Sequence, residues 1–159
     1  MIKHVVMSLM LVSAAATAAG AQGNFKNGQD LTGSWRIEVD IPAGSSACPP
    51  GGPSCTFLAL ATAISDGTIM QTAALPGVST GHGVWRRTGL RQFTVHTTYF
   101  RLADTGFPIG TAETVSVITI DKNGTAASGT YANRIFDLAG NELVGQAFQA
   151  DVTATRITP

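Results

Sequence analysis

Apolar and polar residues alternate along most of the chain after residue 30, which is the pattern of β-strands with one buried face. In the stretch over 91–101, one side carries the more apolar set: Phe93, Val95, Thr97 and Tyr99. The opposite side carries Thr94, His96, Thr98 and Phe100. We therefore expect the first set to face the core and His96 to face solvent.

Short turn signals separate these alternating segments: Ser65-Asp66-Gly67, Thr88-Gly89, Ala103-Asp104-Thr105-Gly106, Asp121-Lys122-Asn123-Gly124 and Asp137-Leu138-Ala139-Gly140-Asn141. They predict strands over 33–41, 56–64, 68–74, 82–87, 91–101, 110–120, 126–136 and 143–157. Because the later turns are short and contain Gly, strands adjacent in sequence should be antiparallel neighbours in space. The pattern predicts an all-β protein with eight strands in up-and-down order.

Eight antiparallel strands can close into a barrel or split into a sandwich. The open edges of long Thr- and Val-rich strands would pair with other molecules, and closure removes those edges. We therefore expect an eight-stranded antiparallel up-and-down β-barrel as a single domain over 33–159, with a β-sandwich as the alternative. The interior of such a barrel is either filled by side chains or holds one small ligand.

Closure would bring the two ends of this domain side by side. Gly33-Ser34-Trp35 begins the first predicted strand, and Arg156 lies near the end of the last one. The guanidinium of Arg156 could then lie flat on the indole of Trp35 and donate to nearby carbonyl groups. This contact would seal one end of the barrel.

A Gly-x-Trp on the first strand together with an Arg on the last resembles the lipocalin and calycin superfamily. The resemblance implies a closed barrel in which Trp35 and Arg156 have a structural role, without ligand contact. It covers the two ends of the domain directly and the middle only through the number of strands. Arg36 departs from the family pattern, since an aromatic residue commonly follows the Trp.

The first 21 residues have the composition of a secretory signal peptide. Lys3 and His4 precede an apolar run over 5–19, which ends in the small-x-small sequence Ala19-Gly20-Ala21. The run is rich in Ala and Ser and is too short for a membrane anchor. We expect cleavage after Ala21, a flexible segment over 22–32, and a secreted or periplasmic protein with no membrane span after cleavage.

Charge gives little indication of a macromolecular partner. The chain has ten Lys and Arg residues against ten Asp and Glu residues, and one of the basic residues, Lys3, lies in the predicted leader. A nearly neutral chain lacks the basic surface that nucleic acid requires, so nucleic acid is not an expected partner. The sequence leaves the oligomeric state open.

The two cysteines, Cys48 and Cys55, bracket a segment rich in Pro and Gly. In an exported chain such a pair is expected to form a disulfide. Their spacing differs from a redox C-x-x-C motif, and no nearby His or second Cys pair could complete a zinc site. We therefore expect a structural disulfide, no metal and no cofactor.

The candidates for ligand contact are polar or aromatic residues of the middle strands: His82, Trp85, Tyr99, Glu113, Tyr131 and Arg134. Gly81 and Gly83 beside the first two favour a bulge or corner, and a ligand-contacting barrel mouth is the alternative. Tyr99 and Tyr131 are most simply lining residues whose hydroxyl groups find partners.

Glu113 is most simply a surface residue. If it lay inside the barrel near Arg101 or Arg134, burial and the cation would compete to set its pKa, and it would be a candidate general acid or base. No G-x-S-x-G elbow is present, and His82 and His96 lack a Ser or Cys partner, so a hydrolase is not expected. No catalytic residue can be assigned.

We expect a barrel that binds a small apolar or amphipathic ligand in its interior or at its mouth. One alternative is a cofactor-free isomerase or cyclase, similar in architecture to allene oxide cyclase and dirigent proteins. That alternative needs a polar cluster in one cavity, drawn from Glu113, Arg134, Tyr131 and Tyr99. The other alternative is a structural exported protein with a packed interior and no ligand.

Overall fold

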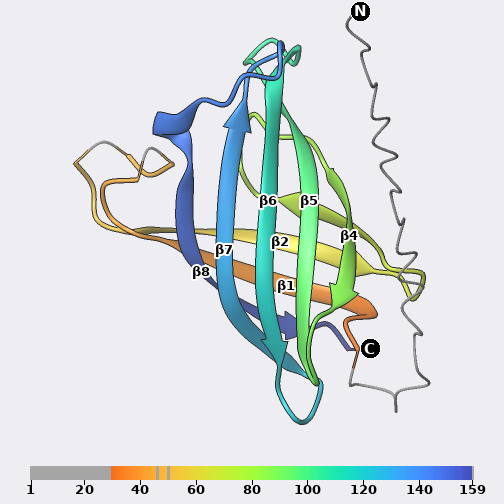
Figure 1. Cartoon of the computed structure of the whole chain (residues 1–159). Helices are drawn as coiled ribbons and strands as arrows, with labels where there is room; N and C mark the ends of the chain where they lie inside the picture. Colours follow the sequence, from red (N-terminus) through yellow and green to blue (C-terminus); the bar gives the residue numbers. More distant parts are fainter. Residues whose placement is uncertain (1–29, 46, 50, 159) are drawn as a thin grey trace, which may run out of the picture.

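The chain forms a closed β-barrel. The computed structural model describes residues 30–45, 47–49 and 51–158, so the predicted leader and most of the segment over 22–32 lie outside the described residues. Each strand pairs antiparallel with its neighbours in sequence, and β1 pairs with β8 to close the barrel (Figure 1). The strands are β1 (Gly33–Ile41), β2 (Cys55–Ala63), β3 (Thr68–Ala73), β4 (Gly81–Arg87), β5 (Gln92–Leu102), β6 (Pro108–Ile120), β7 (Ala126–Phe136) and β8 (Phe148–Arg156). The predicted up-and-down barrel is confirmed, and the sandwich alternative is not adopted.

The last strand is shorter than predicted. We expected it to begin at residue 143, but Val144–Gln146 form a short 3₁₀ turn, η1, and β8 begins at Phe148. The amide of Gln146 donates to the carbonyl of Leu143 at 2.8 Å, the i to i−3 bond of such a turn. Val144 is 76% exposed, so this segment has no core-facing side that would extend the strand.

Alternation along each strand sorts the side chains into an interior and an outer surface. On β5 the side chains of Phe93, Val95, Thr97 and Tyr99 are buried, and His96 is exposed, as the pattern predicted. Buried residues from all eight strands contribute to one hydrophobic core inside the barrel. Alternation also places polar residues in this interior: Gln71, Thr97, Thr114 and Asn133.

Arg156 and Trp35 seal one end of the barrel. The guanidinium carbon of Arg156 lies 4.2 Å from the centre of the Trp35 ring. Arg156 also donates to the carbonyl of Gly124 at 2.6 Å and to that of Asp30 at 2.8 Å. Partial burial lowers the pKa of Arg156, and the Asp30 carboxylate acts in the opposite direction. The contact predicted from the two ends of the sequence is present.

Residues 30–32 belong to this seal. We expected them to lie in a flexible segment, but Leu31 is buried and its carbonyl accepts a hydrogen bond of 2.8 Å from Nε1 of Trp35. The carbonyl of Thr32 accepts another from Arg156. The side chains of Trp35 and Arg156, which form the seal, therefore also hold residues 30–32 in place.

A disulfide joins Cys48 and Cys55, as predicted, with an S–S distance of 2.01 Å. It bridges the connection between β1 and β2, so it ties the long Pro- and Gly-rich hairpin to the barrel. Across the described residues, no helix has both the length and the apolar character required to span a membrane.

Candidate functional site

The structure divides the six candidate residues into two groups. Trp85, Tyr99 and Tyr131 are buried and face the interior. His82, Glu113 and Arg134 occupy positions of the opposite alternation and face outward. Only the first group can contact a ligand inside the barrel.

The outward group forms one row across the outer surface, because His82 pairs with Thr98, Thr98 with Glu113, and Glu113 with Arg134. Arg134 donates from Nε to Oε1 of Glu142 at 2.9 Å. This pair raises the pKa of Arg134 and lowers that of Glu142. The Arg134 side chain is 55% exposed and that of Glu142 is 29% exposed, so solvent screens the pair and it contributes little to stability.

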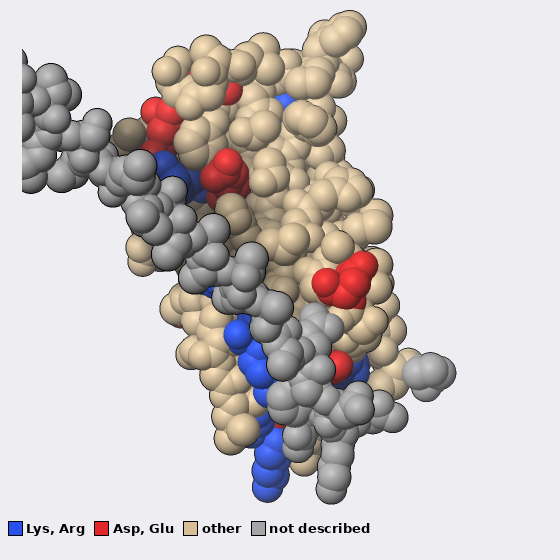
Figure 2. All heavy atoms as spheres, turned by 45° about the vertical axis from the view of Figure 1, so that its right-hand side comes forward, with Lys and Arg blue, Asp and Glu red and all other residues tan. Residues whose placement is uncertain are grey.

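Glu113 lies 4.0 Å from Nε2 of His96 on the same outer surface. Its carboxylate is therefore separated from the interior by the sheet. The face drawn in Figure 2 is mostly uncharged, and its larger group of Lys and Arg atoms lies at the lower end. The alternative that placed Glu113 and Arg134 together inside the barrel is wrong.

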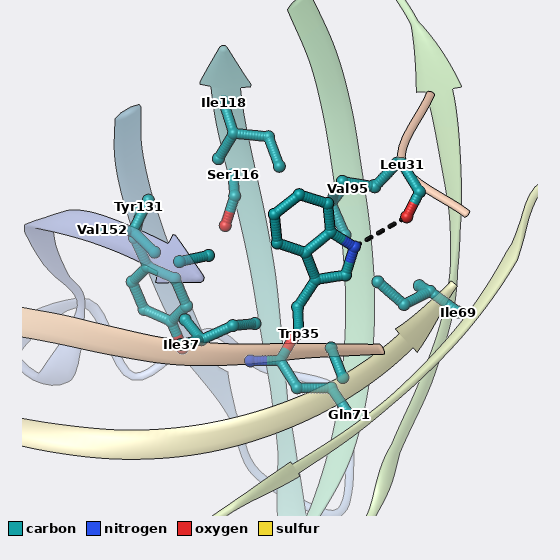
Figure 3. A pocket seen from close by; sticks show the side chains of 12 residues that line it. Leu31, Trp35, Ile37, Ile69, Gln71, Val95, Ser116, Ile118, Tyr131 and Val152 are labelled. Carbon is teal, nitrogen blue, oxygen red and sulfur yellow. Dashed lines mark hydrogen bonds between the residues drawn. The ribbon is translucent and has the colours of Figure 1, made fainter. Parts of the chain in front are cut away.

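A small cavity lies inside the barrel next to the seal, with a volume of about 40 Å³. Figure 3 shows the Trp35 indole among the lining side chains, with Ile118 and Ser116 on one side and Val95 and Leu31 on the other. Trp35 therefore lines the cavity, although the family resemblance implied a structural role without ligand contact. Three of the lining side chains are polar: Gln71, Ser116 and Tyr131. The rest of the lining is Leu31, Trp35, Ile37, Ala61, Ile69, Val95, Ile118, Val152 and Ala154. The volume is enough for water or a molecule of a few non-hydrogen atoms, and is far below that of a drug-sized pocket.

A row of polar side chains lies beside this cavity on the inner wall. Thr97 on β5, Thr114 on β6 and Asn133 on β7 stand opposite one another in register, and all three are buried. Oγ1 of Thr114 donates to the carbonyl of Thr97 at 3.4 Å. Oγ1 of Thr97 and Oδ1 of Asn133 have no hydrogen-bond partner among the described residues. Each such atom costs about 1–3 kcal/mol of folding free energy.

Tyr131 connects the polar row with the cavity. Its ring lines the cavity, and its hydroxyl lies near the side chains of Asn133 and Thr114. Burial raises the pKa of Tyr131 to about 12, and these two polar side chains act in the opposite direction. The ring is fixed by an edge contact with Phe57 at 6.0 Å and a stacked contact with Phe148 at 5.9 Å.

Tyr99 stands close to this group. Burial, and the nearby Tyr131, raise the pKa of Tyr99 well above its usual value. The two phenols are therefore neutral at physiological pH. They can exchange hydrogen bonds with a ligand, but they do not supply a carboxylate-like base.

The glycines of β4 make room for this wall. A Cβ on Gly81 would lie 2.5 Å from the Tyr99 ring and 2.7 Å from the Thr97 methyl group, and a Cβ on Gly83 would lie 1.9 Å from the His96 carbonyl. Both glycines therefore allow β5 and its side chains to approach β4 closely. Their role is geometric, but the pairing of β4 runs through both glycines without a register shift, so the expected bulge is not present.

Trp85 has a structural role. Its Nε1 donates to the carbonyl of Ile64 at 2.9 Å, and its ring meets Phe93 edge-on at 5.7 Å. It does not line the cavity. Of the sequence candidates, only the tyrosines remain beside the cavity and the polar row.

A second, more open hollow, of about 320 Å³, is lined by residues of β1, β7, β8 and the hairpin that carries the disulfide. Asp40 and Asp151 stand opposite each other there, and Thr56 donates to Oδ1 of Asp40 at 2.6 Å. Within the part of the chain that the structure describes, no three His, Cys, Asp or Glu residues are arranged to hold a metal ion.

Alternation placed Thr97 on the core-facing side of its strand, but it did not assign the other polar residues to the interior: Gln71, Thr114, Ser116 and Asn133. The signal that could have found them is a polar residue in a strand position whose neighbours two residues away are apolar. Such a residue lies on the buried face of its strand. Asn133 has the alternation of Tyr131, and Thr97 has that of Val95 and Tyr99. Thr is so common in strands that this signal is weak without coordinates.

Comparison with known proteins does not identify a family: no family model matches the chain, and no curated protein is similar to it in sequence.

Proposed function

We propose that this protein binds a small, mainly apolar molecule inside its barrel. The observation that supports the proposal is the cavity of about 40 Å³ beside Trp35, whose lining is apolar except for Gln71, Ser116 and Tyr131. Transfer of an apolar group from water into such a lining is favourable, and a few polar groups fix its orientation. The volume limits the ligand to a few non-hydrogen atoms.

We further propose that the protein is exported and is related to the lipocalin and calycin superfamily. The Cys48–Cys55 disulfide supports an oxidising compartment. The stacking of Arg156 on Trp35 supports the family resemblance. N-terminal sequencing of the protein from its own host tests export, since cleavage after Ala21 gives a chain that begins at Gln22.

Isomerase or cyclase activity has less support. It requires polar groups that move protons within one cavity, and Glu113 and Arg134 lie on the outer surface. The interior retains the two tyrosines, whose raised pKa values keep them protonated. The remaining alternative is a purely structural barrel that binds nothing.

Nuclear magnetic resonance of the methyl groups tests ligand binding directly. We would titrate the protein with 1-chloropropane, a small apolar probe, and follow the methyl signals of Ile69, Val95, Ile118 and Val152. The proposal predicts saturable shifts at these methyl groups. Shifts confined to exposed residues such as Leu60 and Leu90, or no shifts, would contradict it.

A matched pair of variants makes the test specific. Ala61 lines the cavity, whereas Ala59 is also buried on β2 but does not line it. Ala61→Val should weaken binding because its two added methyl groups occupy the cavity. Ala59→Val adds the same groups elsewhere in the core, so it should retain binding if it folds.

A further inference from the structure

We propose that Thr97 and Asn133 receive a hydroxyl group of the ligand, while its apolar part occupies the cavity beside Trp35. This inference rests on the proposed function and specifies the chemical class of the ligand, a small neutral alcohol. It starts from the two buried atoms that have no partner among the described residues, Oγ1 of Thr97 and Oδ1 of Asn133.

The position of these two atoms favours a ligand over a packing defect. Thr97 is 1% exposed and Asn133 is 6% exposed, so bulk water does not satisfy them. Both belong to the same cross-strand row, with Thr114 between them. One hydroxyl group between them would supply a donor to Asn133 Oδ1 and an acceptor to Thr97 Oγ1.

The row and the cavity are within reach of one small molecule. Thr97 lies two residues along β5 from Val95, and Asn133 lies two residues along β7 from Tyr131. Val95 and Tyr131 both line the cavity. Two residues along a strand span about 6–7 Å, which a chain of three or four atoms can bridge.

The surroundings select a neutral group with both a donor and an acceptor. Asn133 Oδ1 requires a donor, and the Thr97 hydroxyl can donate to an acceptor. The buried polar residues of the described chain are Gln71, Thr97, Thr114 and Asn133, none of which is charged. A charged ligand would be buried without a counter-ion, which is costly, whereas a hydroxyl group meets both needs.

A hydroxyl group could come from an organic alcohol or from water. The proposed ligand is the alcohol. The experiment compares 1-propanol with 1-chloropropane, which has a similar size but cannot donate a hydrogen bond. Dissociation constants would be measured by methyl resonance shifts for the wild type, Thr97→Val and Asn133→Leu. Thr97→Val keeps the shape of the side chain and removes its hydroxyl. Asn133→Leu keeps a similar shape and removes the whole amide, Nδ2 as well as Oδ1.

We expect each substitution to weaken 1-propanol binding about tenfold and to leave 1-chloropropane binding within about twofold. Thr97→Ser keeps the hydroxyl and should restore 1-propanol binding. Thr98→Val makes the same chemical change on the exposed side of β5 and should have no effect. Thermal unfolding of each variant confirms that it is folded, and Thr97→Ser and Asn133→Leu still test the inference if Thr97→Val does not fold.

The outcomes separate this inference from the proposed function. If neither probe binds the wild type, the proposed function is wrong, and this inference fails with it. If 1-chloropropane binds but 1-propanol does not, only the hydroxyl site is wrong. The same holds if the variants bind 1-propanol as tightly as the wild type does. Nuclear Overhauser transfer from a bound water that persists beside Thr97 in the presence of 1-propanol would also overturn it, because water would then be the resident hydroxyl.

Discussion

The inner walls on the two sides of the barrel differ in composition although the same alternation builds both. The wall from β1, β2 and β8 buries apolar side chains such as Trp35, Val39 and Phe57. The wall from β5, β6 and β7 buries the polar row and both tyrosines. Folding alone explains the first wall, since apolar burial stabilises the barrel. The second wall carries unpartnered polar atoms that oppose folding, so it is the wall where a function is to be sought.

The largest expected effect is on the apolar wall, at the seal. Trp35→Ala should lower the free energy of unfolding by about 3–5 kcal/mol, because it removes a buried aromatic ring. It also removes the hydrogen bond to Leu31 and the surface on which Arg156 stacks. Denaturant unfolding measures the change. A loss below about 1 kcal/mol would contradict the role of Trp35 as the seal.

The disulfide stabilises the hairpin that extends from the apolar wall. Replacement of Cys48 and Cys55 together by Ser should lower the free energy of unfolding by about 2.5 kcal/mol, since the closed loop restricts the unfolded chain. Denaturant unfolding of the double variant checks this value. Reduction of the wild-type disulfide should give a loss of similar size. An unchanged unfolding midpoint in both experiments would show that the disulfide contributes nothing to stability.

Exchange of one residue type between the walls tests the comparison itself. Thr97→Val should raise the free energy of unfolding by about 1 kcal/mol, because it removes an unpartnered buried hydroxyl without changing the shape. Val39→Thr places such a hydroxyl in the apolar wall and should lower it by about 1–3 kcal/mol. Thermal and denaturant unfolding in the absence of any ligand give both values. Effects of the same sign would show that the two walls are equivalent.

The tyrosines of the polar wall predict how stability depends on pH. Their pKa values are raised in the folded state, to about 12 for Tyr131, above the value of about 10 for an unfolded chain. The stability that comes from keeping both phenols neutral is therefore fully present below pH about 10. It is lost as pH rises from about 10 through about 12. Denaturant unfolding across this range measures the loss.

The chain has only two tyrosines, so phenolate absorbance reports on this wall alone. In the folded protein the absorbance should rise only well above pH 10, and in denaturant it should rise near pH 10. Titration of the folded protein near pH 10 would show that the phenols are not buried as described.

The smallest effect is expected outside the barrel. Glu113→Gln should change neither the unfolding midpoint nor the binding of 1-chloropropane, because Glu113 faces outward. The same two measurements serve as the check. A clear loss of binding would return Glu113 to the list of functional residues and revive the isomerase alternative.

Period-two alternation and Gly-containing turns predicted the barrel well, because each turn joins neighbouring strands and each strand has one buried face. The seal was also predictable, since Trp35 and Arg156 mark the two ends of the closed sheet. The 3₁₀ turn at Val144–Gln146 was not, because its residues have no pattern that differs from a strand.

The candidate site was harder to predict than the fold. Alternation already placed Tyr99 on the core-facing side of its strand. Trp85 and Tyr131 were placed inside only by the register, and so was the outward direction of His82, Glu113 and Arg134. A shift of one residue would exchange these two groups. The alignment of Thr97, Thr114 and Asn133 in one row depends on three strands at once, and no local pattern in the sequence specifies it.

A crystal structure determined under xenon pressure tests the central claim most directly, because xenon enters small apolar cavities and is visible in electron density. We predict a xenon atom inside the barrel, in contact with Trp35, Ile118 and Val152. Xenon found only on the outer surface, with the space beside Trp35 closed by side chains, would contradict the existence of a ligand cavity.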